Sequence, residues 1–154
     1  MARSMSPERE KEYSELSGYI NFFFTVVVGI SPTDPTHLCN SNIAERFGRA
    51  QALQGARQAA NDTVEALAGK PVEAIRLLDE GLRQAGLLTF TEVSQRYGRT
   101  LKRVLKRGRI TSETEWYLVA GALADCSAQI DSTERTRLER FSAEFEAATT
   151  INRP

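Results

Sequence analysis

Helix-start signals recur along this chain and constrain its fold more than any other feature. Four times a residue that can cap a helix stands three positions before a glutamate, and the pairs are Asn42 and Glu45, Thr89 and Glu92, Ser112 and Glu115, and Asp131 and Glu134. Ser6 followed by Pro7 gives a fifth start, because proline is well tolerated in the first helical turn. Apolar residues then recur at three- and four-residue spacing. The sequence predicts an all-α, single-domain bundle of about six helices spanning residues 1–154.

Glycines and the cap pairs together set the expected helix bounds. Glycine suits the left-handed residue just after a helix, and Gly29, Gly69, Gly86 and Gly108 fall where the apolar periodicity stops. We expect helices over about 7–29, 42–69, 71–86, 89–108, 112–124 and 131–148. The proline- and asparagine-rich segment 31–42 is the longest expected loop, and the tail from about residue 149 is expected to fray.

The apolar run YINFFFTVVVGI, residues 19–30, is the one segment that could suggest a membrane. It is too short, because a spanning helix needs about 20 apolar residues. A strand over 22–28 is also conceivable, but the chain offers no partner strand. We interpret the run as part of a buried helix. Large aromatics are mostly buried, so we favour core positions for Phe22–Phe24 and Trp116 over a dimer surface. We expect a cytoplasmic protein.

Residues that carry catalysis or bind metal are scarce. His37 is the only histidine, so a nucleophile with a histidine base has one candidate base in a proline-rich loop. His37 and Cys39 fall short of the four ligands of a structural zinc site, and with Cys126 so far away the two cysteines are expected to be reduced and buried. Glu113 and Glu115 lie in a first helical turn, where acids are favoured without any function. We expect no catalytic residue, metal or cofactor, and therefore no enzyme.

Seven of the twenty basic residues lie between Arg96 and Arg109, with no acidic residue among them. Apolar residues recur at helical spacing through the same stretch, which predicts one docked helix with a positive outer surface. Together with two nearby aromatic residues, these cations are the candidate partner-binding residues: Arg96, Tyr97, Arg99, Lys102, Arg103, Lys106, Arg107, Arg109 and Trp116.

Two kinds of partner could use this basic surface. Nucleic acid could bind through its phosphates, with Tyr97 stacking on a base. However, the formal net charge is zero and the pI about 6.6, whereas nucleic-acid-binding domains commonly exceed about 9, and the next helix begins with the acidic segment 112–115. Arginine beside aromatics is typical of protein interfaces, so a protein partner is favoured. A third interpretation is a surface that is only solvated, or paired with the acidic face of the first helix.

Two segments, AERFGRAQALQGARQAANDTVEAL and VLKRGRITSETEWYLVAGALAD, resemble stretches of small helical bacterial proteins. Some of those proteins are similar to immunity partners of secreted toxins. The resemblance covers about half of the chain and carries no catalytic motif. It implies a toxin-neutralising protein that binds and blocks a cognate toxin. Nucleic-acid association through the basic residues of 96–109 is the alternative function. The oligomeric state stays open.

Overall fold

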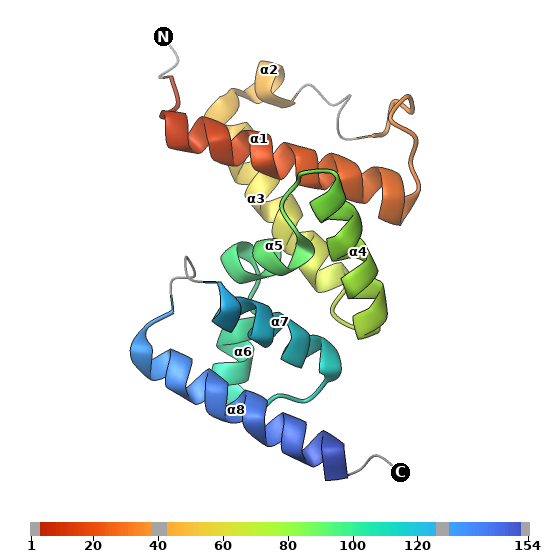
Figure 1. The fold of residues 1–154 in the computed structure, drawn as a ribbon. Coiled ribbons are helices and arrows are strands. Elements are labelled where there is room, and N and C mark those ends of the chain that lie inside the picture. Colours follow the sequence, from red (N-terminus) through yellow and green to blue (C-terminus); the bar gives the residue numbers. More distant parts are fainter. Residues whose placement is uncertain (1–3, 38–42, 126–129, 152–154) are drawn as a thin grey trace.

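Helices follow one another along the whole of the computed structural model, which describes residues 4–37, 43–125 and 130–151 (Figure 1). In chain order they are α1 (Pro7–Phe22), the π-helix η1 (Phe23–Val28), α2 (Ile43–Phe47), α3 (Arg49–Ala66), α4 (Val72–Gln84), α5 (Phe90–Tyr97), α6 (Thr100–Arg107), α7 (Glu113–Ala124) and α8 (Ser132–Ile151). No strand occurs among these described residues. The predicted all-α fold is therefore confirmed.

The helix starts lie where the caps predicted them. Thr89 Oγ1 accepts a hydrogen bond from the backbone N–H of Glu92 at 3.1 Å, and Ser112 Oγ accepts one from Glu115 at 3.1 Å. Such caps satisfy backbone donors that have no partner inside the helix. Asp131 caps α8 and Ser6 caps α1 in the same way. The predicted cap at Asn42 lies outside the described residues.

Glycines interrupt two of the predicted helices, and both predictions of a continuous helix are wrong. The helix expected over 42–69 is broken at Gly48, whose φ of 87° and ψ of 156° belong to a region that glycine alone adopts readily. The helix expected over 89–108 is broken at Gly98, whose extended backbone (φ −87°, ψ 172°) ends α5 before α6 begins. The basic segment 96–109 is therefore not one helix.

The predicted first and last helices also differ from the structure in their C-terminal parts. The first helix does reach Gly29, which is left-handed with a φ of 82°, but its last turns form the π-helix η1. The last helix, expected to end at about residue 148, continues as α8 to Ile151. The hydroxyls of Thr149 and Thr150 donate to the carbonyls of Phe145 and Glu146, both at 2.8 Å, and so add contacts to the last turn.

The core consists of two hydrophobic clusters that meet at α7. The larger cluster joins α1, α3, α4 and α5, with Leu118 contributed by α7. The smaller cluster joins α6, α7 and α8, with Val119 contributed by α7. Figure 1 shows the corresponding arrangement, with α1, α3 and α4 on one side of α5 and α7, and α8 on the other.

The apolar run of the first helix is only partly buried. Phe23 is buried, Phe22 and Phe24 are half-buried, and the valines that follow are exposed, at 60% for Val26 and 51% for Val28. No helix among the described residues is both long enough and apolar enough to cross a membrane.

Candidate functional site

The basic residues of segment 96–109 are distributed over α5, α6 and the residues on either side of α6. Arg96 and Tyr97 end α5, Arg99 stands between the helices, and Arg109 follows α6. The other four, Lys102, Arg103, Lys106 and Arg107, lie on α6. Gly108 closes α6 with a left-handed φ of 83°, as its position in the sequence predicted.

Three of the arginines form ion pairs with glutamates on other helices. The pairs are Arg96 with Glu15 of α1 at 3.5 Å, Arg103 with Glu65 of α3 at 2.5 Å, and Arg107 with Glu115 of α7 at 2.9 Å. Exposed ion pairs each add little stability, typically about 0.2–1 kcal/mol. Their main effect here is to neutralise these cations and to orient α5 and α6 against the rest of the bundle.

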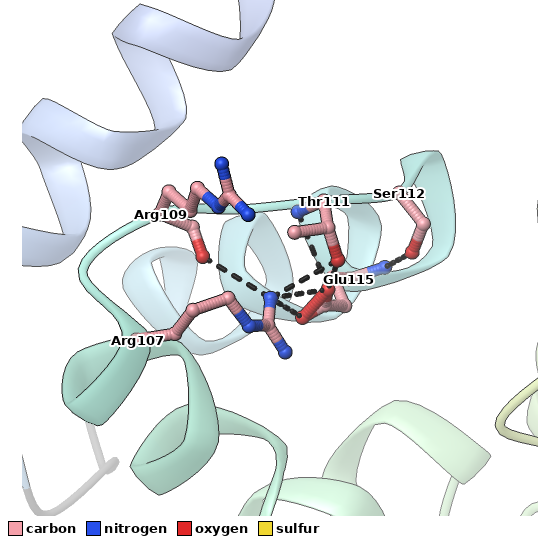
Figure 2. A network of polar contacts seen from close by, with 5 residues as sticks. All are labelled: Arg107, Arg109, Thr111, Ser112 and Glu115. Carbon is pink, nitrogen blue, oxygen red and sulfur yellow. Dashed lines mark hydrogen bonds and ion pairs between the residues drawn. The ribbon is translucent and has the colours of Figure 1, made fainter.

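The pair between Arg107 and Glu115 belongs to a larger network, drawn in Figure 2. Arg107 Nη1 donates to both carboxylate oxygens of Glu115 at 2.9 Å and to Thr111 Oγ1 at 3.0 Å. Thr111 also donates its backbone N–H and its hydroxyl to Glu115. Burial acts to raise the pKa of Glu115, but the hydrogen bonds from Arg107 and Thr111 outweigh it and hold that pKa below its ordinary value. Glu115 is therefore an internal counter-ion.

Four cations remain exposed and without an ion pair to any described residue: Arg99, Lys102, Lys106 and Arg109. Lys102 and Lys106 stand four residues apart, which places them on one face of α6, and Arg99 and Arg109 stand just before and just after that helix. Val104, Leu101 and Leu105 pack on the opposite side, in the smaller cluster. We call Arg99, Lys102, Lys106 and Arg109 the basic stripe. In Figure 2 the Arg109 guanidinium points away from Glu115 and takes no part in the contacts between Arg107 and Glu115.

Tyr97 is engaged within the fold and not displayed beside the stripe. Its ring packs against the larger cluster, and its hydroxyl donates to Glu12 of α1 at 2.7 Å. Arg57 of α3 donates to both oxygens of the same carboxylate, at 2.8 and 2.7 Å. Burial raises the pKa of Tyr97, and the Glu12 carboxylate raises it further. The acidic face of the first helix thus pairs with part of the basic segment, at Glu12 and Glu15.

Trp116 lies on a different side of α7 from Glu115. Its Nε1 donates to Glu146 of α8 at 3.0 Å, and its ring lines an open hollow of about 310 Å³ between α4, α7 and α8. Arg103 and Arg107 instead line a recess on the side of α7 that carries Leu118. The structure does not bring Trp116 together with these two arginines.

No described residues form a group of three or more histidine, cysteine, aspartate or glutamate side chains arranged to hold a metal ion. His37 is buried, with Nε2 3.0 Å from Thr25 Oγ1 and its ring edge-to-face with Phe24. The hydroxyl of Thr25 also contacts the carbonyl of Asn21, so these contacts join the loop to η1. Cys39 and Cys126 lie outside the described residues.

Asp79 is a buried carboxylate that sequence reasoning did not single out. It is 1% exposed and accepts hydrogen bonds from the backbone N–H of Thr91 at 3.1 Å, from the Thr91 hydroxyl, and from Tyr117 at 2.8 Å. It therefore joins α4 to α5 and α7. The available signal was its position, because Asp79 falls on the apolar face of α4, four residues after Ile75.

Charge is the property that sets the surface of α6 apart. The basic stripe offers four exposed cations, while the neighbouring cations of the same segment are already neutralised. No family model, curated protein or solved structure matches this chain. The unpaired cations are thus the feature from which a function can be inferred.

Proposed function

We propose that this chain is a non-enzymatic protein-binding module whose contact surface is the basic stripe. The observation that carries the proposal is the division of cations on and around α6. Arg103 and Arg107 are neutralised from within the fold, whereas the stripe has no counter-ion among the residues that the structure describes. An acidic patch on a partner would supply them, and complementary charge of this kind speeds association and fixes the orientation of docking.

A discrete acidic protein surface fits the stripe better than a phosphate backbone does. At 1.5 Å per residue, the eight residues of α6 extend about 12 Å, which limits the length of contact. Carboxylates also border the stripe, because Glu65 and Glu115 hold the flanking arginines. A continuous polyanion running past α6 would meet those carboxylates, while a folded partner can place its acids opposite the stripe alone.

The resemblance to immunity proteins suggests the finer identity of the partner. If it holds, the partner is a bacterial toxin domain and the chain acts by covering it, in the cytoplasm, without any chemical step. Such a mechanism requires a specific surface and no catalytic residue. The toxin partner remains a prediction that binding to defined proteins must test.

The experiment measures fluorescence anisotropy with two labelled probes, an oligoglutamate and a single-stranded oligonucleotide of equal charge. The stripe variant replaces all four cations by glutamine: Arg99→Gln, Lys102→Gln, Lys106→Gln and Arg109→Gln. Four exposed charge contacts of roughly 0.3–0.5 kcal/mol each predict about a tenfold weaker oligoglutamate complex. The matched control neutralises four exposed cations elsewhere: Arg9→Gln, Arg76→Gln, Arg83→Gln and Arg140→Gln.

Three results would count against the proposal. One is an oligoglutamate affinity that falls equally in the control variant, and another is no oligoglutamate binding at low salt. The third is tighter binding of the oligonucleotide with a steep salt dependence, which would replace the proposal by the nucleic-acid alternative. A complex with the product of a neighbouring gene, weakened by the stripe variant and not by the control, would identify the partner.

A further inference from the structure

A recess lined by both apolar and polar residues, about 220 Å³ in volume, opens beside the basic stripe, between α3, α5, α6 and α7. Its floor is formed by side chains of the larger cluster, among them Val64, Phe90 and Leu118, which are all buried. Arg103 and Arg107 stand among its polar lining residues. The recess thus combines an apolar floor with a charged edge.

The size of the recess suits one large apolar side chain. A cavity of about 150 Å³ can admit benzene, so a recess of about 220 Å³ has room for a leucine or phenylalanine side chain. Arg103, bonded to Glu65, and the bonded pair of Arg107 and Glu115 line the same recess beside its apolar side chains. An entering apolar side chain would displace water from the apolar part of this lining.

The recess and the basic stripe share α6. Thr100, Arg103 and Arg107 line the recess. Arg103 stands three residues before Lys106, so these two are neighbours on the helix surface, with Cβ atoms about 5–6 Å apart, and Arg99 precedes the same helix. A carboxylate bound by Lys106 would lie one side chain away from the opening.

We infer that the partner docks through an acidic segment that carries one large apolar side chain, whose carboxylates contact the stripe and whose apolar group fills the recess. This inference rests on the proposed function, since it places the acidic partner on the same surface. The stripe sets the charge of the segment, and the recess selects its apolar residue.

Two matched peptides test the inference against the full-length chain labelled with ¹⁵N. Both are short oligoglutamates with a single central substitution, phenylalanine in one and alanine in the other. Amide chemical shifts followed during titration give both dissociation constants. The phenylalanine peptide should bind at least tenfold more tightly, and its largest shifts should surround Val64, Phe90 and Leu118.

A variant that fills the recess supplies the second arm. Ala68 is exposed and lines the recess, so Ala68→Phe should remove the tenfold preference while the alanine peptide binds as before. Ala66 is exposed two positions earlier and does not line the recess, so Ala66→Phe is the matched control and should keep the preference. Thermal melts of both variants establish that each is folded.

The outcomes separate this inference from the proposed function. Equal affinity of the two peptides for the wild-type chain, with both weakened by the stripe variant, overturns the apolar anchor and leaves the acidic partner in place. A preference that survives Ala68→Phe also overturns the anchor. Failure of both peptides to bind overturns the proposed function and the anchor together.

Discussion

Gly98, between α5 and α6, is the position where adding a single methyl group tests the packing of the bundle most directly. Any residue can adopt its φ of −87° and ψ of 172°, so alanine would cause no backbone strain there. Alanine would instead clash sterically, because its Cβ atom would lie 2.6 Å from the carbonyl oxygen of Ser94 and 3.0 Å from Val64 Cγ1. The backbone N–H of Gly98 also donates to that same oxygen, at 3.0 Å.

The destabilisation expected for Gly98→Ala follows from these contacts. Overpacking a well-packed site costs about 1–3 kcal/mol, and the Ser94 carbonyl cannot retreat without weakening its hydrogen bond, worth about 0.5–1.5 kcal/mol. We therefore expect a loss of about 2–4 kcal/mol in the free energy of unfolding. At about 2–4 °C per kcal/mol for a chain of this size, the midpoint of thermal unfolding should fall by about 5–15 °C. Urea unfolding followed by circular dichroism measures the free energy directly.

Two other glycines separate the steric explanation from a conformational one. Gly55 lies inside α3 with nothing within 4 Å of an added Cβ, so Gly55→Ala should stabilise the fold by about 0.5–1 kcal/mol. Gly108 has equally open space but a φ of 83°, so Gly108→Ala should cost about 1–2 kcal/mol from backbone strain alone. If Gly98→Ala proves as stable as the wild type, or gains stability as Gly55→Ala should, the steric reasoning is refuted.

Two further predictions concern carboxylates inside the bundle. The hydrogen bond from Arg57, aided by the one from Tyr97, holds the pKa of Glu12 below its ordinary value. The ionised Glu12 carboxylate therefore stabilises the fold at pH values above that ordinary pKa, and this stabilisation is lost as the pH falls through the lower pKa of the folded state. Melting temperatures from pH 7 to pH 3 should therefore fall further for the wild type than for Glu12→Gln, and parallel curves would contradict this. Asp79→Asn should lower the free energy of urea unfolding by about 2–3 kcal/mol, because an amide nitrogen replaces an acceptor for Thr91; an unchanged midpoint would show that the buried charge is dispensable.

Helix starts and most helix ends could be predicted from the sequence because their causes are local. The hydroxyl of Thr89 caps a backbone N–H three residues away, and that of Ser112 does the same. Gly29 and Gly108 both adopt the left-handed conformation expected just after a helix. In each case the residues responsible lie within one helical turn, so their spacing in the sequence is enough.

The helix breaks and the division of the cations depend on residues far apart in the chain. Nothing near Gly98 in the sequence distinguishes it from a glycine inside a helix such as Gly55, and the break brings it against Val64 of α3. Arg103 is separated by 38 residues from the glutamate that neutralises it. Arg103 and Lys106 therefore look alike in the sequence, and only the fold, which brings Glu65 of α3 to Arg103, makes one of them a paired cation and the other an unpaired one.

Adjacent residues of α7 face different hydrophobic clusters, Leu118 the larger and Val119 the smaller. Such a division allows partial opening, in which α8 detaches and exposes the smaller cluster while the larger one stays closed. The inner side of α6 loses Leu138 and Phe141 in that opening, although its basic stripe faces away from them. A partner that requires an ordered α6 would therefore oppose the opening, and the amide protons of α8 would exchange more slowly in the complex at a site the partner never touches.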